Sequence, residues 1–235
     1  MSKNKRRVVV CCPAFGGQLS NHFVTSILET QLAMIKEGIS FSVLIIANES
    51  LISRGRNKCA QMAMAGKFTD LFFIDADIGW KWQDFLKILK SPNHVVGGTY
   101  SMKMLPINLN YNLLPEDRAL YQRSHIKSKA ILEQMIEDKG KEEIEVQHVP
   151  TGFMRISVTA LERLKHKVDA YKQQNPRTGE IEDYWDLFPV RVKDGNLMSE
   201  DWMFCELCRE NGIPVFMNLS VINHHIGSFD FWEAE

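Results

Sequence analysis

The stretch Leu71–Trp80 reads LFFIDADIGW, an apolar run that ends in two aspartates one residue apart. A short apolar run bounded by polar residues is typical of a strand buried on both faces of a sheet. We therefore predict a strand over 70–74, with Asp75 and Asp77 at its carboxyl end. Open α/β sheets bind their ligands at the carboxyl ends of their strands. This stretch thus predicts both a central strand and the location of a site.

Upstream of this strand, apolar strands alternate with amphipathic segments of helical period. The pattern predicts strands over 7–12 and 41–46 and helices over 20–37 and 51–65. Downstream, it predicts a helix over 82–89 and further strands near 94–97, 149–156 and 215–221. Alternation of this kind indicates an α/β fold, a Rossmann-like and mainly parallel central sheet flanked by helices.

Length and composition agree with one domain over residues 1–235. The chain is 45% hydrophobic and 24% charged, which is ordinary for a globular protein. Two segments interrupt the alternation. Residues 113–147 are highly charged and predict a helical insertion on the surface. Residues 166–196 are polar but contain Tyr184, Trp185 and Phe188, and predict a flexible loop of the kind that closes over ligands.

Charge and cysteine content narrow the class of protein. The formal net charge is -1, so no overall basic field favours a nucleic-acid or anionic-membrane partner. Five cysteines, an odd number, argue against a disulfide framework and for a reducing compartment. No apolar run approaches the roughly 18 residues that span a bilayer. We expect a cytoplasmic protein, of the cell or of an infected host cell, without a membrane span.

The two aspartates favour a metal site. Carboxylates beside an apolar core need cations, and hard oxygen ligands suit Mg²⁺ or Mn²⁺, with phosphate oxygens completing the coordination. The alternative is structural, with Asp75 capping the following helix and Asp77 solvated. An isolated D-x-D pattern does not separate these two interpretations.

Flanking blocks resemble the GT-A fold nucleotide-sugar glycosyltransferases, and in particular small viral or bacterial family-2-like members with a DxD motif. The resemblance runs from about residue 8 to residue 232, in the order of the family, and leaves 113–147 and 166–196 unmatched. The matching blocks are SRGRN at 53–57 with Ala60, DADIGW at 75–80, VGGTY at 96–100, TGFM at 151–154, SEDWMFC at 199–205 and HIG at 225–227.

This resemblance implies roles for individual residues. Asp75, Asp77 and His225 would hold Mn²⁺ or Mg²⁺, with Asp77 the more direct ligand and His224 an alternative to His225. Asp201 would be the base that takes the acceptor proton in an inverting mechanism, with Glu200 beside it. Either acid could instead serve to compensate the helix dipole. A retaining mechanism would change these roles.

The remaining expected contacts concern the two substrates. Donor-binding residues are predicted at Pro13, Ala14, Gly17, Arg54, Arg56, Asn57, Asp75 and Ala76. Gly16 and Gln18 lie in the same loop, and the helix amino end with its two arginines suits a diphosphate. Acceptor-binding residues are predicted at Thr151, Gly152, Phe153 and Trp185.

The function expected from all this is metal-dependent transfer of a sugar from a nucleotide-diphosphate donor, a UDP-sugar by preference, to a hydroxyl acceptor such as a glycan. One alternative is a viral-type enzyme that glycosylates a hydroxymethylated DNA base, which the near-neutral charge does not favour. An alternative of another functional class is a non-catalytic nucleotide-binding module. A metal-dependent phosphohydrolase would need more clustered carboxylates than the sequence shows.

Overall fold

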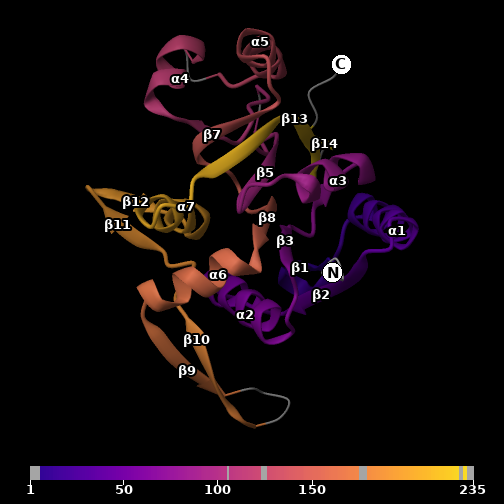
Figure 1. The fold of residues 1–235 in the computed structure, drawn as a ribbon, viewed down its shortest axis with the longest axis vertical. Helices are drawn as coiled ribbons and strands as arrows, with labels where there is room; N and C mark the ends of the chain where they lie inside the picture. Colours follow the sequence, from indigo (N-terminus) through magenta and orange to yellow (C-terminus); the bar gives the residue numbers. More distant parts are fainter. Residues whose placement is uncertain (1–5, 105, 123–125, 175–178, 228–229, 232–235) are drawn as a thin grey trace, which may run out of the picture.

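The computed structural model describes residues 6–104, 106–122, 126–174, 179–227 and 230–231. Its principal element is a sheet whose strands follow the order β2-β1-β3-β8-β5-β13-β7-β6, with the short strands β4 and β14 also paired to β13 (Figure 1). The strands of this sheet are β1 (Arg7–Ala14), β2 (Ser40–Ala47), β3 (Asp70–Ile74), β4 (Ile78–Gly79), β5 (Val95–Tyr100), β6 (Asn112–Leu113), β7 (Glu143–His148), β8 (Phe153–Ser157), β13 (Val215–Ile226) and β14 (Asp230–Phe231).

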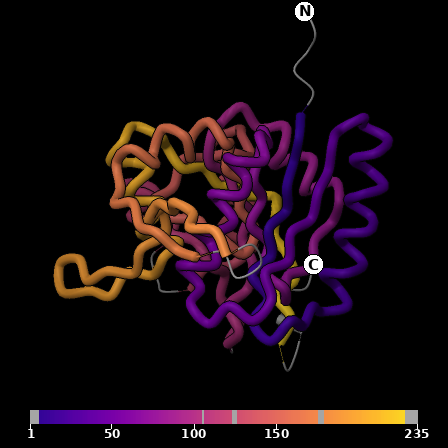
Figure 2. The backbone as a smooth tube through the Cα atoms, turned by 90° about the horizontal axis from the view of Figure 1, so that it is seen from below, coloured from indigo at the N-terminus to yellow at the C-terminus, as the bar shows by residue number. Residues whose placement is uncertain are grey.

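Helices cover both faces of this sheet. They are α1 (Asn21–Lys36), α2 (Ile52–Ala65), α3 (Trp82–Lys90), α4 (Pro115–Tyr121), α5 (Lys129–Lys139), α6 (Val158–Leu164) and α7 (Glu200–Glu210), with short 3-10 turns at Phe15–Gly17 and Lys165–Lys167. Two further hairpins are β9 (Ala170–Gln174) with β10 (Ile181–Trp185), and β11 (Arg191–Lys193) with β12 (Asn196–Met198). The β11–β12 hairpin projects on the side of the molecule opposite α1 (Figure 2).

The alternation of side chains along the strands produces two apolar layers. Val8 and Val10 of β1, with Phe72 of β3, belong to a cluster shared with α1 and α3. Their sequence neighbours Val9 and Phe73 belong to a second cluster that includes residues of α2, α5, α6 and α7. Successive residues of a strand point to opposite faces, so an almost continuous apolar run is what a strand needs between two helical layers.

The α/β class with a mainly parallel central sheet flanked by helices is confirmed. Parallel pairs join β1 to β2, β1 to β3 and β5 to β13. The sheet differs from a fully parallel one because β8 lies between β3 and β5 and is antiparallel to both. Strand β7 is likewise antiparallel to β13. The predicted strand near 149–156 begins later in the structure. Residues 149–152 form the turn between β7 and β8, and β8 starts at Phe153.

The two segments that interrupt the alternation contain regular structure. Residues 113–147 form α4, α5 and most of β7, and Leu132 and Met135 of α5 are buried. In the segment 166–196, Tyr184 and Phe188 are buried, and the Phe188 ring stacks on Phe204 with centroids 4.5 Å apart. These aromatic side chains are occupied in packing. Residues 175–178 of the predicted loop lie outside the described part of the chain.

Candidate functional site

A cleft of about 570 Å³ lies at the carboxyl ends of β1 and β3. Its volume is within the range of small-molecule sites. The side chains that line it come from five parts of the chain: Pro13, Phe15, Gln18, Leu19, Ser20, Ile52, Arg56, Asp75, Ala76, Asp77, Glu200 and Ile226. The cleft thus contains the DADIGW block, the start of α2 and the start of α7, three segments that the sequence placed at one edge of the sheet.

The loop that bears the two aspartates is fixed by its backbone. The Asp75 N–H donates to the Gly152 carbonyl (3.1 Å), the Ala76 carbonyl accepts from Ser20 N–H (2.9 Å), and the Asp77 carbonyl accepts from Ile226 N–H (2.8 Å). Each bond joins the loop to a different segment of the chain, so the backbone that bears both carboxylates is held by tertiary structure.

Asp75 faces a buried arginine. Arg56 is 3% exposed, its Nη2 lies 3.1 Å from Asp75 Oδ1, and its Nε lies 3.0 Å from Glu200 Oε1. Burial alone would lower the pKa of Arg56, but the Asp75 and Glu200 carboxylates raise it. The guanidinium also lies over the Phe73 ring, 5.1 Å from its centroid, and its Nη1 is buried without a partner among the described residues. The guanidinium of Arg56 therefore links Asp75 to Glu200 at the start of α7.

Asp77 faces two side chains that the first aspartate does not contact. Lys103 Nζ lies 2.5 Å and His225 Nε2 lies 3.6 Å from Asp77 Oδ2. Burial would raise the pKa of Asp77, but the neighbouring His225 and Lys103 side chains outweigh it and lower the pKa to about 2. The carboxylate is therefore ionised at neutral pH.

The orientation of His225 suits a metal ligand. Its Nδ1 lies 2.7 Å from the Ser101 carbonyl oxygen, which can only accept, so Nδ1 bears the proton. Nε2 of the neutral ring then keeps a lone pair for a cation, and it lies 3.6 Å from Asp77 Oδ2. Metal-bound histidines commonly donate their second ring N–H to a backbone carbonyl in this manner. Asp77 and His225 thus fit a divalent cation.

The three expected metal ligands do not form one group. Within the described ranges, no three His, Cys, Asp or Glu side chains converge in a way that could hold a metal ion. Asp75 Oδ1 is turned to Arg56 instead. The structure therefore brings Asp77 and His225 together and leaves Asp75 to the arginine. His224, the alternative ligand, stacks on His22 with ring centroids 5.9 Å apart.

Asp201 and Glu200 begin α7, as expected. Glu200 lines the cleft, whereas Asp201 is not among the lining residues and accepts hydrogen bonds from Ser199 Oγ and Trp202 N–H (2.9 Å), both at Oδ1. Burial and the neighbouring Glu200 carboxylate raise the pKa of Asp201. A raised pKa favours a carboxylate as a proton acceptor at neutral pH.

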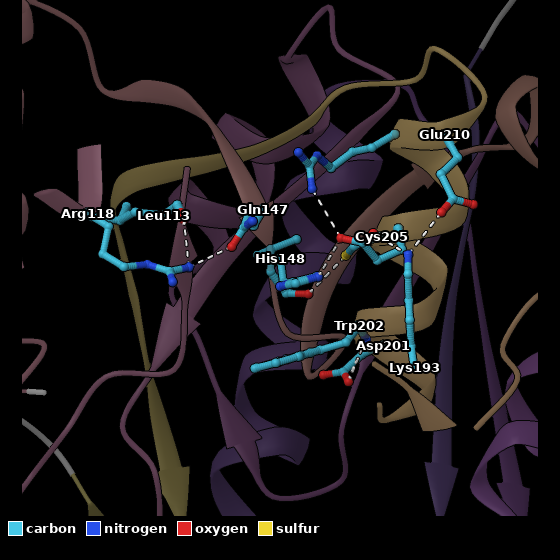
Figure 3. A network of polar contacts seen from close by, with 12 residues as sticks. Leu113, Arg118, Gln147, His148, Lys193, Asp201, Trp202, Cys205 and Glu210 are labelled. Carbon is cyan, nitrogen blue, oxygen red and sulfur yellow. Dashed lines mark hydrogen bonds and ion pairs between the residues drawn. The ribbon is translucent and has the colours of Figure 1, made fainter. Parts of the chain in front are cut away.

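A polar network behind the cleft anchors the start of α7. The His148 ring of β7 stacks on Trp202 with centroids 4.6 Å apart and planes 2° apart (Figure 3). Burial lowers the pKa of His148 to about 4, so the ring is neutral and donates from Nε2 to Glu206 (3.1 Å). Lys193 reaches Glu206 and Glu210 at 3.0 Å each. The contacts of His148 with Trp202 and Glu206 hold α7 against β7, and Asp201 directly precedes Trp202.

The expected donor-binding residues separate into two groups. Pro13, Arg56, Asp75 and Ala76 line the cleft. Ala14 and Gly17 belong to the same loop without lining it: Ala14 is buried, and Gly17 has a φ of 70° in the turn that follows. Arg54 pairs with Glu49 at 2.6 Å, away from the cleft. Asn57 accepts from the Phe188 N–H (3.0 Å) and contacts Asp186 (3.3 Å), and so joins α2 to the segment after β10.

The expected acceptor-binding residues are mostly buried. Thr151 is 2% and Phe153 0% exposed. At Gly152 any Cβ would lie 2.5 Å from the Tyr100 hydroxyl oxygen, so only glycine fits between β8 and this ring. Trp185 packs against the core with the Lys165 ammonium 5.3 Å from its ring centroid. None of these four residues is among those that line the cleft.

The sequence analysis gave no role to Tyr100, although it ends the VGGTY block, and did not single out Lys103. Burial raises the pKa of Tyr100, and Asp75 and Asp201 raise it further, so this hydroxyl is a neutral group near two of the site's acids. Tyr100 ends the VGGTY block and Lys103 follows it by three residues. The position of both residues at or just after the end of β5 was a signal that could have identified them.

Comparisons with known proteins support the fold. No protein-family model and no curated protein matches the chain. The crystal structure of A197 from STIV is similar with a TM-score of 0.53 and 15% sequence identity, over 94% of this chain and 86% of that one. A glycosyltransferase involved in the glycosylation of the major capsid of PBCV-1 gives a TM-score of 0.32 and 10% identity, over 67% of this chain and 63% of that one. The first likeness shows a shared fold, and the second is too weak to support an argument.

Across the described ranges, no helix is both long enough and apolar enough to span a membrane. The five cysteines are free and buried.

Proposed function

We propose that the protein is a metal-dependent glycosyltransferase that moves a sugar from a nucleotide-diphosphate donor, by preference a UDP-sugar, to a hydroxyl acceptor such as a glycan. The observation that supports this most is the position of His225 Nε2, which lies 3.6 Å from Oδ2 of Asp77, a residue that lines the cleft at the sheet edge. The order of the sequence blocks that meet at this cleft agrees with the resemblance to GT-A enzymes. Mn²⁺ or Mg²⁺ is the proposed cofactor.

In this proposal each side of the cleft has one task. Asp77 and His225 hold the cation, which when bound neutralises charge on the departing diphosphate. Arg56, with its unpartnered Nη1, donates to phosphate oxygens from the opposite side. Pro13 and Ala76 contact the nucleoside.

The acceptor proton goes to Asp201. Both hydrogen bonds that described residues donate to this carboxylate reach Oδ1, which leaves Oδ2 to take a proton from the acceptor hydroxyl. The stack of Trp202 on His148 holds the carboxylate in place. Thr151 and Gly152 form the turn beside Asp75 that we assign to the acceptor side, because the Gly152 carbonyl accepts from the Asp75 N–H.

The first test is donor binding by thermal shift. Wild type, Asp77→Asn and the control Asp183→Asn, an exposed hairpin residue paired with Lys172, are each heated with UDP, GDP, CMP, UDP-glucose or GDP-mannose, with and without Mn²⁺. A ligand at a hundred times its Kd stabilises by about 2.7 kcal/mol. We expect one nucleotide to raise Tm only with Mn²⁺, in wild type and Asp183→Asn but not in Asp77→Asn. Equal stabilisation of Asp77→Asn would refute the metal site, and the lack of any shift would refute this donor class.

The second test separates an enzyme from a nucleotide-binding module. Asp201→Asn should bind the donor as wild type does, while kcat for release of the nucleoside diphosphate falls by about 10² to 10⁴, the usual contribution of a general base. Unchanged turnover would contradict the role of Asp201, and a wild type that binds the donor without turning over any hydroxyl acceptor would favour the module.

A further inference from the structure

Lys103 supplies a positive charge at the oxygen where the proposed cation would bind. Its Nζ lies 2.5 Å from Asp77 Oδ2, the same oxygen that faces His225 Nε2. The two side chains of the ion pair are 38% and 37% exposed, so neither is enclosed by the core. Asp77 therefore has a counter-ion of its own within the chain.

The backbone around Lys103 positions this side chain beside Asp77, which lines the cleft. The Met104 N–H donates to the Met102 carbonyl (2.8 Å), which makes Lys103 the central residue of a three-residue turn. The Met102 N–H donates to the Asn108 carbonyl (2.7 Å), and Ser101 is bridged to Leu109, so the base of the loop is fixed. The turn is thus a defined element, two residues from the Ser101 carbonyl that orients His225.

An ammonium and a divalent cation compete for this carboxylate. Both are attracted to Asp77 Oδ2, and two cations at contact distance repel each other. Lysine has a compact charge on a flexible four-carbon stem, so it can leave the carboxylate without a change in the backbone. The diphosphate of a bound donor is a strong anion that the proposed reaction brings into the cleft that Asp77 lines.

We propose that Lys103 is an exchangeable counter-ion, which pairs with Asp77 in the free protein and with a phosphate of the donor once a divalent cation has displaced it. This inference rests on the proposed function, because it assumes that Asp77 binds a cation and that the cleft binds a diphosphate. It adds a donor-binding residue that acts after the metal has bound. It also explains why one aspartate of the motif has a flexible cationic partner.

The test begins with calorimetric titration of Mn²⁺ into the protein without nucleotide. Lys103→Met removes the competing charge at nearly constant length, and Lys172→Met, in the exposed pair with Asp183, is the matched control. We expect Lys103→Met to bind Mn²⁺ about tenfold more tightly than wild type, since a partly screened ion pair is lost from the competition. Lys172→Met should match wild type. Equal or weaker Mn²⁺ binding by Lys103→Met would overturn the exchange.

The second measurement titrates UDP and uridine at saturating Mn²⁺. Lys103→Met should bind UDP about tenfold more weakly than wild type, as expected for the loss of one charged phosphate contact, and should bind uridine equally well. Unchanged UDP affinity would overturn the phosphate contact. If wild type binds Mn²⁺ and UDP but Lys103→Met changes neither affinity, only the proposed role of Lys103 is refuted. If neither wild type nor any variant binds Mn²⁺, both the proposed metal site and this inference are refuted.

Discussion

Asp75 and Asp77 are separated by one residue and line the same cleft, where they have different kinds of partner. Asp75 pairs with Arg56, a buried cation that also binds Glu200. Asp77 pairs with Lys103 on a surface turn and with the ring of His225. The first pair connects packed elements and has little freedom to move. The pair of Asp77 with Lys103 is partly exposed and can rearrange. The comparison teaches that a D-x-D pattern can combine one structural carboxylate with one that is available to a ligand.

The largest effect should come from removing the buried partner of Asp75. Arg56→Met leaves the Asp75 and Glu200 carboxylates together without their cation. Breaking a fully buried pair costs about 3 to 5 kcal/mol, and because Asp75 is 31% exposed we expect a loss near the lower end of that range. Urea unfolding of wild type and variant measures it. A loss below 1 kcal/mol would show that Arg56 does not hold these elements together, and the contrast with Asp77 would then disappear.

A smaller effect is expected from Asp75→Asn. The amide oxygen can still accept from Arg56, so the loss is that of a charge-assisted hydrogen bond, about 1 to 2 kcal/mol in unfolding free energy. Mn²⁺ affinity should fall less than tenfold, in contrast with its loss in Asp77→Asn. If Asp75→Asn abolishes Mn²⁺ binding as completely as Asp77→Asn, both aspartates are metal ligands.

The dependence of stability on pH should report the charge on Asp77. Its pKa in the folded protein is about 2, below the ordinary value. A carboxylate with a lowered folded-state pKa contributes stability that is fully present above its unfolded pKa, near 4, and is lost as the pH falls towards 2. Because the side chain is 37% exposed, we expect only about 1 kcal/mol after solvent screening.

Urea unfolding with EDTA at pH 6 and pH 3 measures this contribution. The difference in stability between wild type and Asp77→Asn should be smaller at pH 3 than at pH 6. A difference that does not change with pH would mean that Asp77 has an ordinary pKa and no effective counter-ion.

The smallest effect is expected at Arg54, which serves as the control for Arg56. Arg54 is on the same helix turn but is 42% exposed and pairs with Glu49 at the surface. Arg54→Met should cost about 0.2 to 1 kcal/mol, the usual value of an exposed pair. A cost equal to that of Arg56→Met would mean that burial does not distinguish the two arginines.

Sequence periodicity predicted the amino-terminal part of the fold because its contacts are local. Strands β1 to β3 and helices α1 and α2 occur where the apolar pattern placed them. The reversed direction of β8 could not be predicted, because an apolar run such as Phe153–Ser157 has the same pattern in either direction. The order of β8, β5 and β13 depends on pairing between distant segments, which leaves no local signal.

The same reasoning applies to the candidate site. Asp75, Asp77 and Arg56 were expected at the cleft and line it, because strand ends and helix starts meet at one sheet edge. Arg54 was expected there too, but two residues along a helix turn a side chain by about 200°, so Arg54 and Arg56 point to different sides. Lys103 was missed because a lone lysine after a strand has no pattern to distinguish it.

The position of β13 also has a consequence for folding during synthesis. This strand pairs with β5, β7, β4 and β14, and it bears His225 and the Ile226 N–H that binds the Asp77 carbonyl. Strands β5 and β7 leave the ribosome long before it and have exposed edges until it arrives. We expect nascent chains that lack β13 to require chaperone protection, and the cleft to form only when this late strand inserts between its neighbours.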